Sequence, residues 1–244
     1  MSVQPLPLTD QVALITGAGR GIGRAIALRM AKAGVRTVLA ARTEQELQAT
    51  AEIILQHGGK TLVVPTDVTQ DDQVDNLVKQ TLAYYGQVDI LVNNAGGGPP
   101  RTPIVKSRIT DWEQTLKVNL WAAMSLTKLI LPFMIERQHG TIITLGSIAS
   151  FTGQAGEAAY AASKFGLRGF TQSLFEEVRR YGIKVSFLCP GYVDTALIPP
   201  NKRIHREKLL SPADVAEAAY NIAVSSPRAC PAEVILQPQF EPFR

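Results

Sequence analysis

Short apolar runs recur along the chain and are separated by longer helical stretches. The runs are rich in valine, isoleucine, leucine and threonine. They are near-continuous rather than alternating, as expected for strands that are covered on both faces. The sequence predicts strands at residues 12–16, 37–41, 61–65, 89–93, 141–145, 184–188 and 233–237.

The segments between these runs carry helix start signals. Two Thr-x-x-Glu segments, at residues 43–46 and 110–113, have the spacing of a capping box. Ser211 precedes Pro212, which predicts a helix with a serine N-cap and a proline at its first position. The helix that begins after Thr43 should end near the two glycines at 58–59.

Strand and helix alternate across nearly the whole chain, which predicts βαβ units with right-handed crossovers and a parallel sheet between helical layers. Residues 1–244 contain no linker, low-complexity tract or repeat, so we expect a single domain. Two segments interrupt the alternation, at residues 96–103 and 196–210. Both follow carboxyl ends of strands, where open α/β sheets bind ligands. We therefore expect substrate contacts there, with a substrate loop at about residues 193–210.

Composition is that of a soluble globular protein, with 45% hydrophobic and 19% charged residues among 244. Cys189 and Cys230 lie far apart without CxxC spacing, which indicates a reducing compartment and buried thiols. The N-terminus lacks the features of a signal peptide. No uninterrupted apolar run reaches the roughly 18 residues that span a membrane. We expect a cytoplasmic protein with no membrane association.

The formal net charge of +4 is mild, and nothing in the sequence predicts a nucleic-acid or metal site. The densest basic stretch, residues 201–208, has no interleaved aromatic residues, so a solvated loop is the simpler interpretation. Attraction of an acidic substrate or carrier stays open. Three histidines, His57, His139 and His205, have no metal-ligand spacing, and we expect them at the surface.

A glycine-rich loop joins the first predicted strand to the first helix. Gly17, Gly21 and Gly23 form the pattern TGxxxGxG. We expect Gly17 to permit a tight turn, Gly21 to let the backbone approach a pyrophosphate, and Gly23 to allow close helix–sheet packing. The helix N-terminus offers free N–H groups and partial positive charge to phosphates. This loop, between a strand and a helix, predicts a dinucleotide site.

The end of the second strand indicates which dinucleotide binds. An NAD site usually has an acidic residue there to hold the ribose 2′-hydroxyl. Here Ala41 is followed by Arg42, and Arg20 stands inside the glycine loop. Two cations suit a 2′-phosphate, so we expect NADP(H). Alternatively Arg42 is solvated and Arg20 helps only with the pyrophosphate; Glu44, the nearest acid, belongs to the start of the second helix.

Tyr160 and Lys164 are four residues apart and share one face of a predicted helix. A free tyrosine has a pKa of about 10, and a nearby ammonium favours its phenolate. Such a pair is suited to acid/base catalysis near neutral pH. Ser147 follows the fifth strand, and its hydroxyl can hydrogen-bond a substrate oxygen beside Tyr160.

These residues resemble the short-chain dehydrogenase/reductase family, in its branch of about 250 residues, across essentially the whole chain. The family's ordered motifs are present as TGAGRGIG at residues 16–23, Asp67 with Val68, NNAG at residues 93–96, Asn119, Ser147, Tyr160 with Lys164, and Pro190 with Gly191. The resemblance implies a Rossmann-type, doubly wound parallel sheet of about seven strands with helices on both faces.

The resemblance also implies the role of each catalytic residue. Tyr160 would exchange a proton with the substrate oxygen, and Ser147 would orient the carbonyl. Lys164 would hold the nicotinamide ribose and depress the pKa of Tyr160. Asn119 would bind a water that links Lys164 to solvent.

A larger set is implied to bind the cofactor, with Asp67 and Val68 at the adenine and Val193 and Thr195 at the carboxamide. Asp67 could instead cap a helix, and Thr195 could begin one. The set comprises Gly17, Gly19, Arg20, Gly21, Ile22, Gly23, Arg42, Asp67, Val68, Asn93, Ala95, Gly96, Tyr160, Lys164, Pro190, Gly191, Val193 and Thr195.

The implied reaction is NADP(H)-dependent interconversion of a ketone and a secondary alcohol. Relatives that reduce 3-oxoacyl groups suggest a thioester on acyl carrier protein or CoA as the substrate; other carbonyls or hydroxy acids, and a non-catalytic NADP(H)-binding regulator, are alternatives. The resemblance implies a homo-oligomer, a tetramer or a dimer. The chain departs from many relatives in its short loop before Ser211 and in its C-terminal segment EVILQPQFEPFR. Both features leave the substrate and the mode of assembly open.

Overall fold

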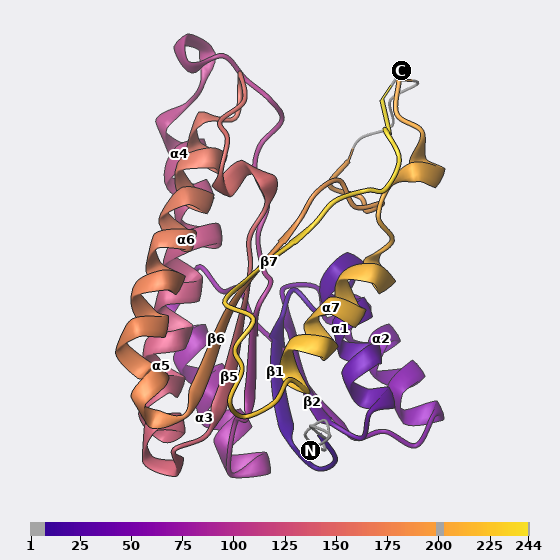
Figure 1. Cartoon of the computed structure of the whole chain (residues 1–244), viewed down its shortest axis with the longest axis vertical. Helices are drawn as coiled ribbons and strands as arrows, with labels where there is room; N and C mark the ends of the chain where they lie inside the picture. The colour runs from indigo at the N-terminus through magenta and orange to yellow at the C-terminus, as the bar shows by residue number, and fades with distance from the viewer. Residues whose placement is uncertain (1–7, 199–202, 244) are drawn as a thin grey trace.

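The computed structural model describes residues 8–198 and 203–243, and within them the predicted strands form one parallel sheet (Figure 1). The strand order is β3-β2-β1-β4-β5-β6-β7. The strands are β1 (Val12–Thr16), β2 (Arg36–Ala41), β3 (Thr61–Pro65), β4 (Ile90–Asn93), β5 (Gly140–Leu145), β6 (Ile183–Pro190) and β7 (Glu233–Leu236). The order reverses at β1, so β1 and β4 are neighbours at the centre. The predicted doubly wound fold is confirmed.

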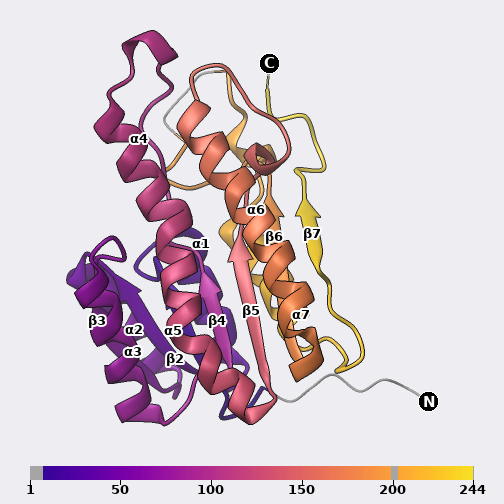
Figure 2. The same cartoon turned by 90° about the vertical axis from the view of Figure 1, so that its left-hand side faces the viewer.

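Helices cover both faces of the sheet (Figures 1 and 2). One layer holds α1 (Gly21–Lys32), α2 (Glu44–Gln56) and α7 (Pro212–Ala223). The other holds α3 (Asp71–Tyr85), α5 (Ala122–Arg137) and α6 (Ala158–Val178). In β1, Ala13 and Ile15 face the first layer while Val12 and Leu14 face the second. Both faces of the strand are buried, which explains its continuous apolar sequence.

The predicted start of the last helix is confirmed. Ser211 occupies the N-cap of α7, and its hydroxyl accepts a hydrogen bond from Asp214 N at 3.2 Å. The Asp214 carboxylate accepts one in return from Ser211 N at 2.7 Å. Two otherwise unpaired N–H groups at the helix start are thereby satisfied.

The two predicted Thr-x-x-Glu capping boxes are wrong. Thr43 is the N-cap residue of α2, but its side chain makes no cap hydrogen bond, and the Glu46 carboxylate pairs with Arg20 at 3.4 Å rather than returning to Thr43. The other segment lies inside a helix, since α4 (Ile109–Leu116) begins one residue before Thr110.

Residues 109–137 form one continuous helix made of α4, a π-helical turn (Lys117–Trp121) and α5. It has 29 residues and contains an 18-residue window with a mean hydropathy of 1.5, so it is long and apolar enough to cross a membrane by length and composition alone. Here the helix contacts α3, α6 and the sheet (Figure 2). The expectation of no apolar run of this length holds only for uninterrupted runs, because polar residues such as Asn119 and Lys128 break this one.

The amino end of β6 is fastened to the segment that follows α7. Lys184 in β6 is 8% exposed, and its ammonium donates to the Ser225 carbonyl oxygen and, at 2.9 Å, to Ser225 Oγ. Cys230 lies beside this pair and its Sγ donates to the Val185 carbonyl at 3.3 Å. Cys230 is only half-buried, whereas Cys189 is buried as expected.

Candidate active site

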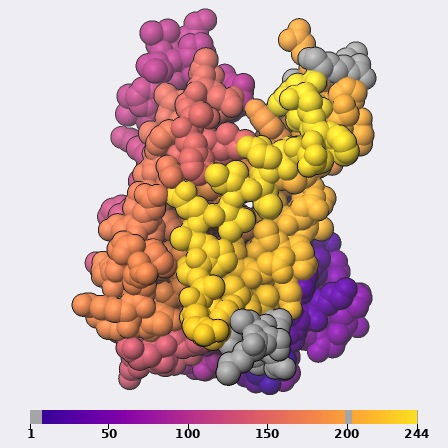
Figure 3. Space-filling model, in the orientation of Figure 1, coloured from indigo at the N-terminus to yellow at the C-terminus, as the bar shows by residue number. Residues whose placement is uncertain are grey.

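The predicted site residues gather at the carboxyl ends of the strands, where the chain divides into two arms (Figure 1). One arm contains the segments 97–108 and 151–157. The other contains the segment after β6 together with the C-terminal residues 237–243. Figure 3 shows the molecular surface hollowed between the two arms. The glycine loop and the start of α6 lie at the base of the arms, as expected for an open α/β sheet.

The glycine loop needs glycine at two turns and at one close contact. Gly17 and Gly21 have φ of +67° and +55°, a left-handed backbone that other residues rarely adopt. A Cβ on Gly23 would lie 2.2 Å from the Gly17 carbonyl oxygen. The same Cβ would lie 2.5 Å from Asn94 Nδ2. Gly17 and Asn94 directly follow β1 and β4, so Gly23 lets the start of α1 pack closely against the ends of these strands, in agreement with the expected helix–sheet packing. A Cβ on Gly19 would lie 2.8 Å from Cβ of Glu46, so this glycine allows α2 to approach.

The start of α1 is suited to bind an anion. Its N-cap residue Arg20 makes no side-chain cap, and the first turn contains no acidic residue. The partial positive charge of the helix N-terminus is thus not offset locally. Ile22 follows in the first turn and contacts the core beneath it. These features fit a pyrophosphate group.

The two predicted cations have different surroundings. Arg20 is 70% exposed and pairs with Glu46, which offsets part of its charge. Arg42 is exposed just beyond β2 and makes no hydrogen bond or ion pair with any residue in 8–198 or 203–243. Of the two, Arg42 is the one that keeps its full charge for a ligand phosphate.

Asn94 and Thr16 tie the glycine loop to the end of β4, and the sequence reasoning missed both. Thr16 Oγ1 accepts hydrogen bonds from Asn94 N and Ala95 N, each at 3.0 Å. Asn94 Nδ2 donates to the Thr16 carbonyl oxygen at 2.8 Å. The NNAG motif was the available signal, since Asn94 is its second residue. Asn93, which was included, turns its side chain to α5 and donates to Thr127 Oγ1 at 3.0 Å.

Asn119 lies in the π-helical turn and is 1% exposed. Its Oδ1 accepts from Gly97 N at 2.9 Å, and its Nδ2 donates to the Gly97 carbonyl at 2.7 Å. A Cβ on Gly96 would lie 2.6 Å from Asn119 Oδ1 and 3.6 Å from Lys164 Nζ. Asn119 therefore fixes the glycine segment beside Lys164. Because Gly97 engages both ends of its side-chain amide, the water relay stays a prediction.

Tyr160, Lys164 and Ser147 converge where α6 begins. Lys164 is 5% exposed, its Nζ donates to the Leu145 carbonyl at 2.8 Å, and it lies 5.8 Å from the centre of the Tyr160 ring. Ser147 stands two residues after β5, near enough to the Tyr160 hydroxyl to lower the pKa of Tyr160. A Cβ on Gly98 would lie 3.2 Å from the ring of Tyr160, so the glycine segment covers one side of it.

The protonation of this group differs from the sequence expectation. Burial raises the pKa of Tyr160, the hydrogen bond with Ser147 offsets this in part, and the charge of Glu157 raises it further. Burial also lowers the pKa of Lys164 from 10.5 to about 8. Lys164 was expected to depress the pKa of Tyr160, but desolvation dominates and the shift is upward. Tyr160 is therefore protonated at neutral pH, the state required of a proton donor.

The remaining predicted cofactor residues lie around the same edge of the sheet. Asp67 Oδ1 accepts from Thr69 N at 2.9 Å and from Thr69 Oγ1 at 2.8 Å, and Val68 is buried beside it. The helix α3 begins four residues later with Gln70 as N-cap, so Asp67 does not cap it. Pro190 ends β6, and Gly191 N donates to the Leu236 carbonyl at 2.7 Å.

The segment after β6 reaches back to the glycine loop. A Cβ on Gly21 would lie 3.5 Å from Thr195 Cγ2. Val193 is buried and forms an isolated parallel bridge with Leu210. These contacts bring Val193 and Thr195 close to the start of α1, although their expected contacts with a carboxamide stay predictions.

The substrate loop is braced from within and by the C-terminal segment. Arg206 pairs with Asp194 at 2.7 Å and donates to the Thr195 carbonyl at 3.1 Å. Tyr192 contacts Phe243 edge to face with ring centres 4.8 Å apart, and a hollow of about 300 Å³ lies beside them. The atypical C-terminus thus forms part of one arm of the cleft. Of the basic stretch 201–208, residues 201–202 lie outside the described residues, and Arg206 in it is engaged in this brace.

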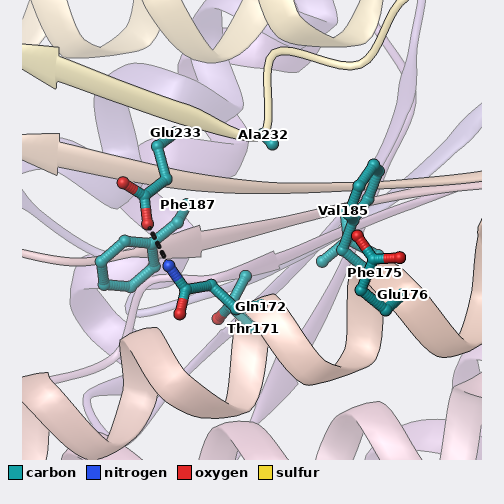
Figure 4. Close-up of a pocket in the computed structure, with 8 residues that line it drawn as sticks. All are labelled: Thr171, Gln172, Phe175, Glu176, Val185, Phe187, Ala232 and Glu233. Carbon is teal, nitrogen blue, oxygen red and sulfur yellow. Dashed lines mark hydrogen bonds between the residues drawn. The ribbon is translucent and has the colours of Figure 1, made fainter.

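A separate groove of about 390 Å³ lies on the outer face between α6 and the strands β6 and β7 (Figure 4). Its lining includes Phe175, Phe187 and Glu233, and Gln172 donates to Glu233 at 2.8 Å. None of the predicted site residues lines it. The hydrogen bonds within this groove are those of helix and strand packing.

Comparison with known proteins identifies the class. The family described as short chain dehydrogenase matches residues 11–203. An uncharacterized oxidoreductase of Staphylococcus aureus is 38% identical over 216 residues, which cover 86% of this chain and 90% of that protein. A 3-oxoacyl-[acyl-carrier-protein] reductase of Synechocystis is 36% identical over 189 residues, with 77% and 76% covered. The chain belongs to the short-chain dehydrogenase family.

Solved structures agree with this assignment. A metagenomic short-chain oxidoreductase in complex with NADP has a TM-score of 0.85 and 33% identity, covering 97% of this chain and 100% of that one. An alcohol dehydrogenase from Thermococcus sibiricus, complexed with 5-hydroxy-NADP, has a TM-score of 0.87 and 27% identity, covering 95% and 97%.

Proposed function

We propose that this oxidoreductase uses NADP(H) to reduce a ketone to a secondary alcohol, and that a 3-oxoacyl thioester on acyl carrier protein or CoA is its substrate. One observation carries the proposal. The partly buried Tyr160 and Ser147 meet the buried Lys164 beside an uncapped helix start and a glycine loop. A hydroxyl donor, a buried cation and a phosphate-binding backbone are thus combined in one cleft.

The cofactor assignment is supported by the loop and by Arg42. The glycine loop and the start of α1 fit the pyrophosphate. Arg42, which has no ion pair among the residues that the structure describes, fits a 2′-phosphate. Two similar solved structures contain NADP or a derivative of it. When bound, the nicotinamide supplies or accepts the hydride, and the protein aligns it with the substrate.

Replacing Arg42 tests this assignment. We expect Arg42→Ala to weaken NADPH binding at least about tenfold, because a charge-assisted contact with phosphate is lost. NADH binding should change less than about twofold, since NADH has no such phosphate. Fluorescence titration of both cofactors measures this, and an equal loss for both would remove the basis for NADP(H).

The residues of the cleft perform the proton chemistry. Tyr160 is held protonated by burial, so its hydroxyl can donate to the carbonyl oxygen as that oxygen gains charge. Ser147 presents a second hydroxyl to the same oxygen and stabilises its charge. Lys164, with a pKa of about 8, is mostly cationic at neutral pH and favours the phenolate that remains. Asn119 holds the segment at Gly97 that closes over this group.

The substrate is supported by similarity to the Synechocystis reductase, and other small carbonyls or hydroxy acids are the alternative. Similarity to an archaeal alcohol dehydrogenase favours that alternative. Docking of an acidic carrier protein at Arg137, Arg179, Arg180 and the basic segment is part of the thioester hypothesis. Of these, Arg137 is committed to a buried ion pair with Asp89 at 2.7 Å. We also infer a cytoplasmic homo-oligomer, a tetramer or a dimer, without nucleic-acid partners.

The decisive experiment follows oxidation of NADPH and NADH with a short 3-oxoacyl thioester and with a panel of simple ketones. Rapid NADPH oxidation with the thioester alone would support an acyl reductase. Turnover with other ketones alone would keep the mechanism and discard the thioester.

Replacing the proton donor tests the mechanism itself. Tyr160→Phe should lose at least about a hundredfold in kcat, because the hydroxyl that donates the proton is removed. NADPH affinity should remain nearly intact. Normal turnover by the Tyr160→Phe variant would contradict this mechanism. If the parent protein itself binds NADPH tightly but shows no turnover, the result would favour the non-catalytic regulator.

A further inference from the structure

Arg101 joins one arm of the cleft to the start of the helix that carries Tyr160. Its Nε donates to Glu157 Oε1 at 2.6 Å and its second nitrogen donates to Gln154 Oε1 at 2.5 Å. The backbone reinforces this contact, because Thr102 N donates to the Gly156 carbonyl at 3.0 Å. Residues 101–102 are therefore fastened to residues 154–157.

The acidic partner of Arg101 is the charged residue closest in sequence to the proton donor. Glu157 immediately precedes α6 and is separated from Tyr160 by two alanines, so the two lie within one helical turn. Its side chain is only 22% exposed, so solvent screens its charge incompletely. The charge of Glu157 raises the pKa of Tyr160. Arg101 thus neutralises a charge to which Tyr160 responds.

The same segment also contacts Tyr160 directly. A Cβ on Gly98 would lie 3.2 Å from the Tyr160 ring, and Arg101 follows three residues later. The segment 97–102 therefore runs from the ring of Tyr160 to the carboxylate of Glu157. This path links the position of the segment with the electrostatic surroundings of the hydroxyl.

Other groups act on this centre from the neighbouring elements, and the side chain of one of them, Tyr192, also interacts with Arg101. They are Lys164 on α6, Ser147 after β5, Cys189 on β6 beside Lys164, and Tyr192 after β6 beside Arg101.

We propose that Arg101 and Glu157 form a positioning pair in which Arg101 screens Glu157 and thereby sets how readily Tyr160 exchanges its proton. The inference rests on the proposed role of Tyr160. Neither residue is required to touch the substrate. The pair acts through the charge next to Tyr160 and through the segment that covers its ring.

The direction of each effect follows from charge. Alcohol oxidation needs the Tyr160 phenolate, so its rate rises with pH along an acid limb. Removing the Arg101 cation exposes Tyr160 to the full charge of Glu157, which moves that limb to higher pH. Removing the Glu157 charge moves the limb to lower pH. A merely structural contact would lower the rate at every pH alike.

The test measures kcat/KM for alcohol oxidation across pH in Arg101→Gln, Glu157→Gln and the double variant. At a pH below the midpoint of the limb, we expect Arg101→Gln to be about threefold slower than the parent and Glu157→Gln about threefold faster. The pH limb of the double variant should lie where that of Glu157→Gln lies, because the charge that Arg101 screens is absent from both variants. Arg101→Lys should keep the parent profile.

A matched ion pair on the same helix provides the control. Glu176 pairs with Arg179 at 3.3 Å at the far end of α6, and Glu176→Gln should leave the profile unchanged. Equal losses at all pH values in Arg101→Gln, or no opposite shift in Glu157→Gln, would overturn the proposal.

A second readout separates this inference from the proposed function. NMR of ring-labelled tyrosine, with Tyr160→Phe to assign the signal, follows ionisation of Tyr160 without turnover. Opposite shifts in the two single variants support the pair even if Tyr160→Phe proves active, in which case only the proposed function fails. If the ionisation of Tyr160 is unchanged in both single variants, the proposed role of the Arg101–Glu157 pair is overturned. If Tyr160→Phe is at the same time inactive, the proposed function still holds.

Discussion

Two buried lysines, at opposite ends of the sheet, have different surroundings. Lys164 and Lys184 are 5% and 8% exposed, and burial lowers the pKa of both. Lys184 donates to two acceptors of Ser225, its carbonyl and its hydroxyl. Among the residues that the structure describes, Lys164 has a single acceptor, the Leu145 carbonyl. The Lys184 ammonium therefore has two hydrogen-bond acceptors within the described chain, whereas the Lys164 ammonium has one.

This difference separates a structural lysine from a functional one. An ammonium group has three donors, and each donor that is buried without an acceptor costs free energy. Lys164 retains that cost close to Gly96, whose Cβ, if present, would lie 3.6 Å from the Lys164 Nζ. A ligand hydroxyl within hydrogen-bond distance of Nζ would complete its hydrogen bonds. We interpret the unsatisfied ammonium as the part of the site that awaits a partner.

The largest expected effect concerns activity. Lys164→Met should lower kcat at least about a thousandfold, because the cation that stabilises the Tyr160 phenolate is removed. Lys184→Met should stay within about threefold of the parent, since it lies at the other end of the sheet. Steady-state kinetics of both variants test the comparison, and similar losses in the two would contradict it.

The next effect concerns stability and pH. The pKa of Lys164 falls from 10.5 to about 8 on folding, so between these values the unfolded chain binds more protons than the folded one. The unfolding free energy of the parent should therefore rise with pH from 8 to 10.5, by up to about 3 kcal/mol relative to Lys164→Met. Urea unfolding at several pH values measures this rise. A constant difference across that range would show that Lys164 is not desolvated.

The smallest expected effect concerns the hydrogen bond between Lys184 and Ser225, which we expect to affect stability alone. Ser225→Ala removes one acceptor of Lys184 and should lower the unfolding free energy by about 1 kcal/mol. The kcat should not change, because no site residue contacts Ser225. Denaturant unfolding and a rate assay on the same preparation test both statements, and a fall in kcat without a loss of stability would speak against them.

The sequence predicted the fold well because the strand signal does not depend on distant partners. Strands buried on both faces must be apolar throughout, so β1, β3 and β5 were found within one residue of their ends. The start of α7 was found because Ser211 and Asp214 complete their own capping box. At the failed box at Thr43, Glu46 instead pairs with Arg20, which is distant in sequence and close only after folding.

The sequence predicted which residues form the site better than it predicted how these residues contact one another. Tyr160 and Lys164 are related by helical spacing, which any helix fixes. The upward pKa shift of Tyr160 depends on burial by neighbours such as Gly98, which spacing does not reveal. Two further contacts could not be predicted either: the ion pair of Arg206 with Asp194 and the ring contact of Phe243 with Tyr192. Each joins segments that come close only in the folded protein.

The π-helical turn at residues 117–121 has a consequence for tolerance to deletion. A π turn holds one residue more than an α turn, so this helix behaves as if it carried a one-residue insertion. Deleting one residue there would let an ordinary α-helix continue with its two halves still nearly in phase, because the π turn already absorbs the extra residue within one turn. The local bulge that places Asn119 against Gly97 would be lost, while α4 and α5 would keep their faces. The extra residue of this turn thus shapes the position of Asn119 without changing the phase of the helix around it.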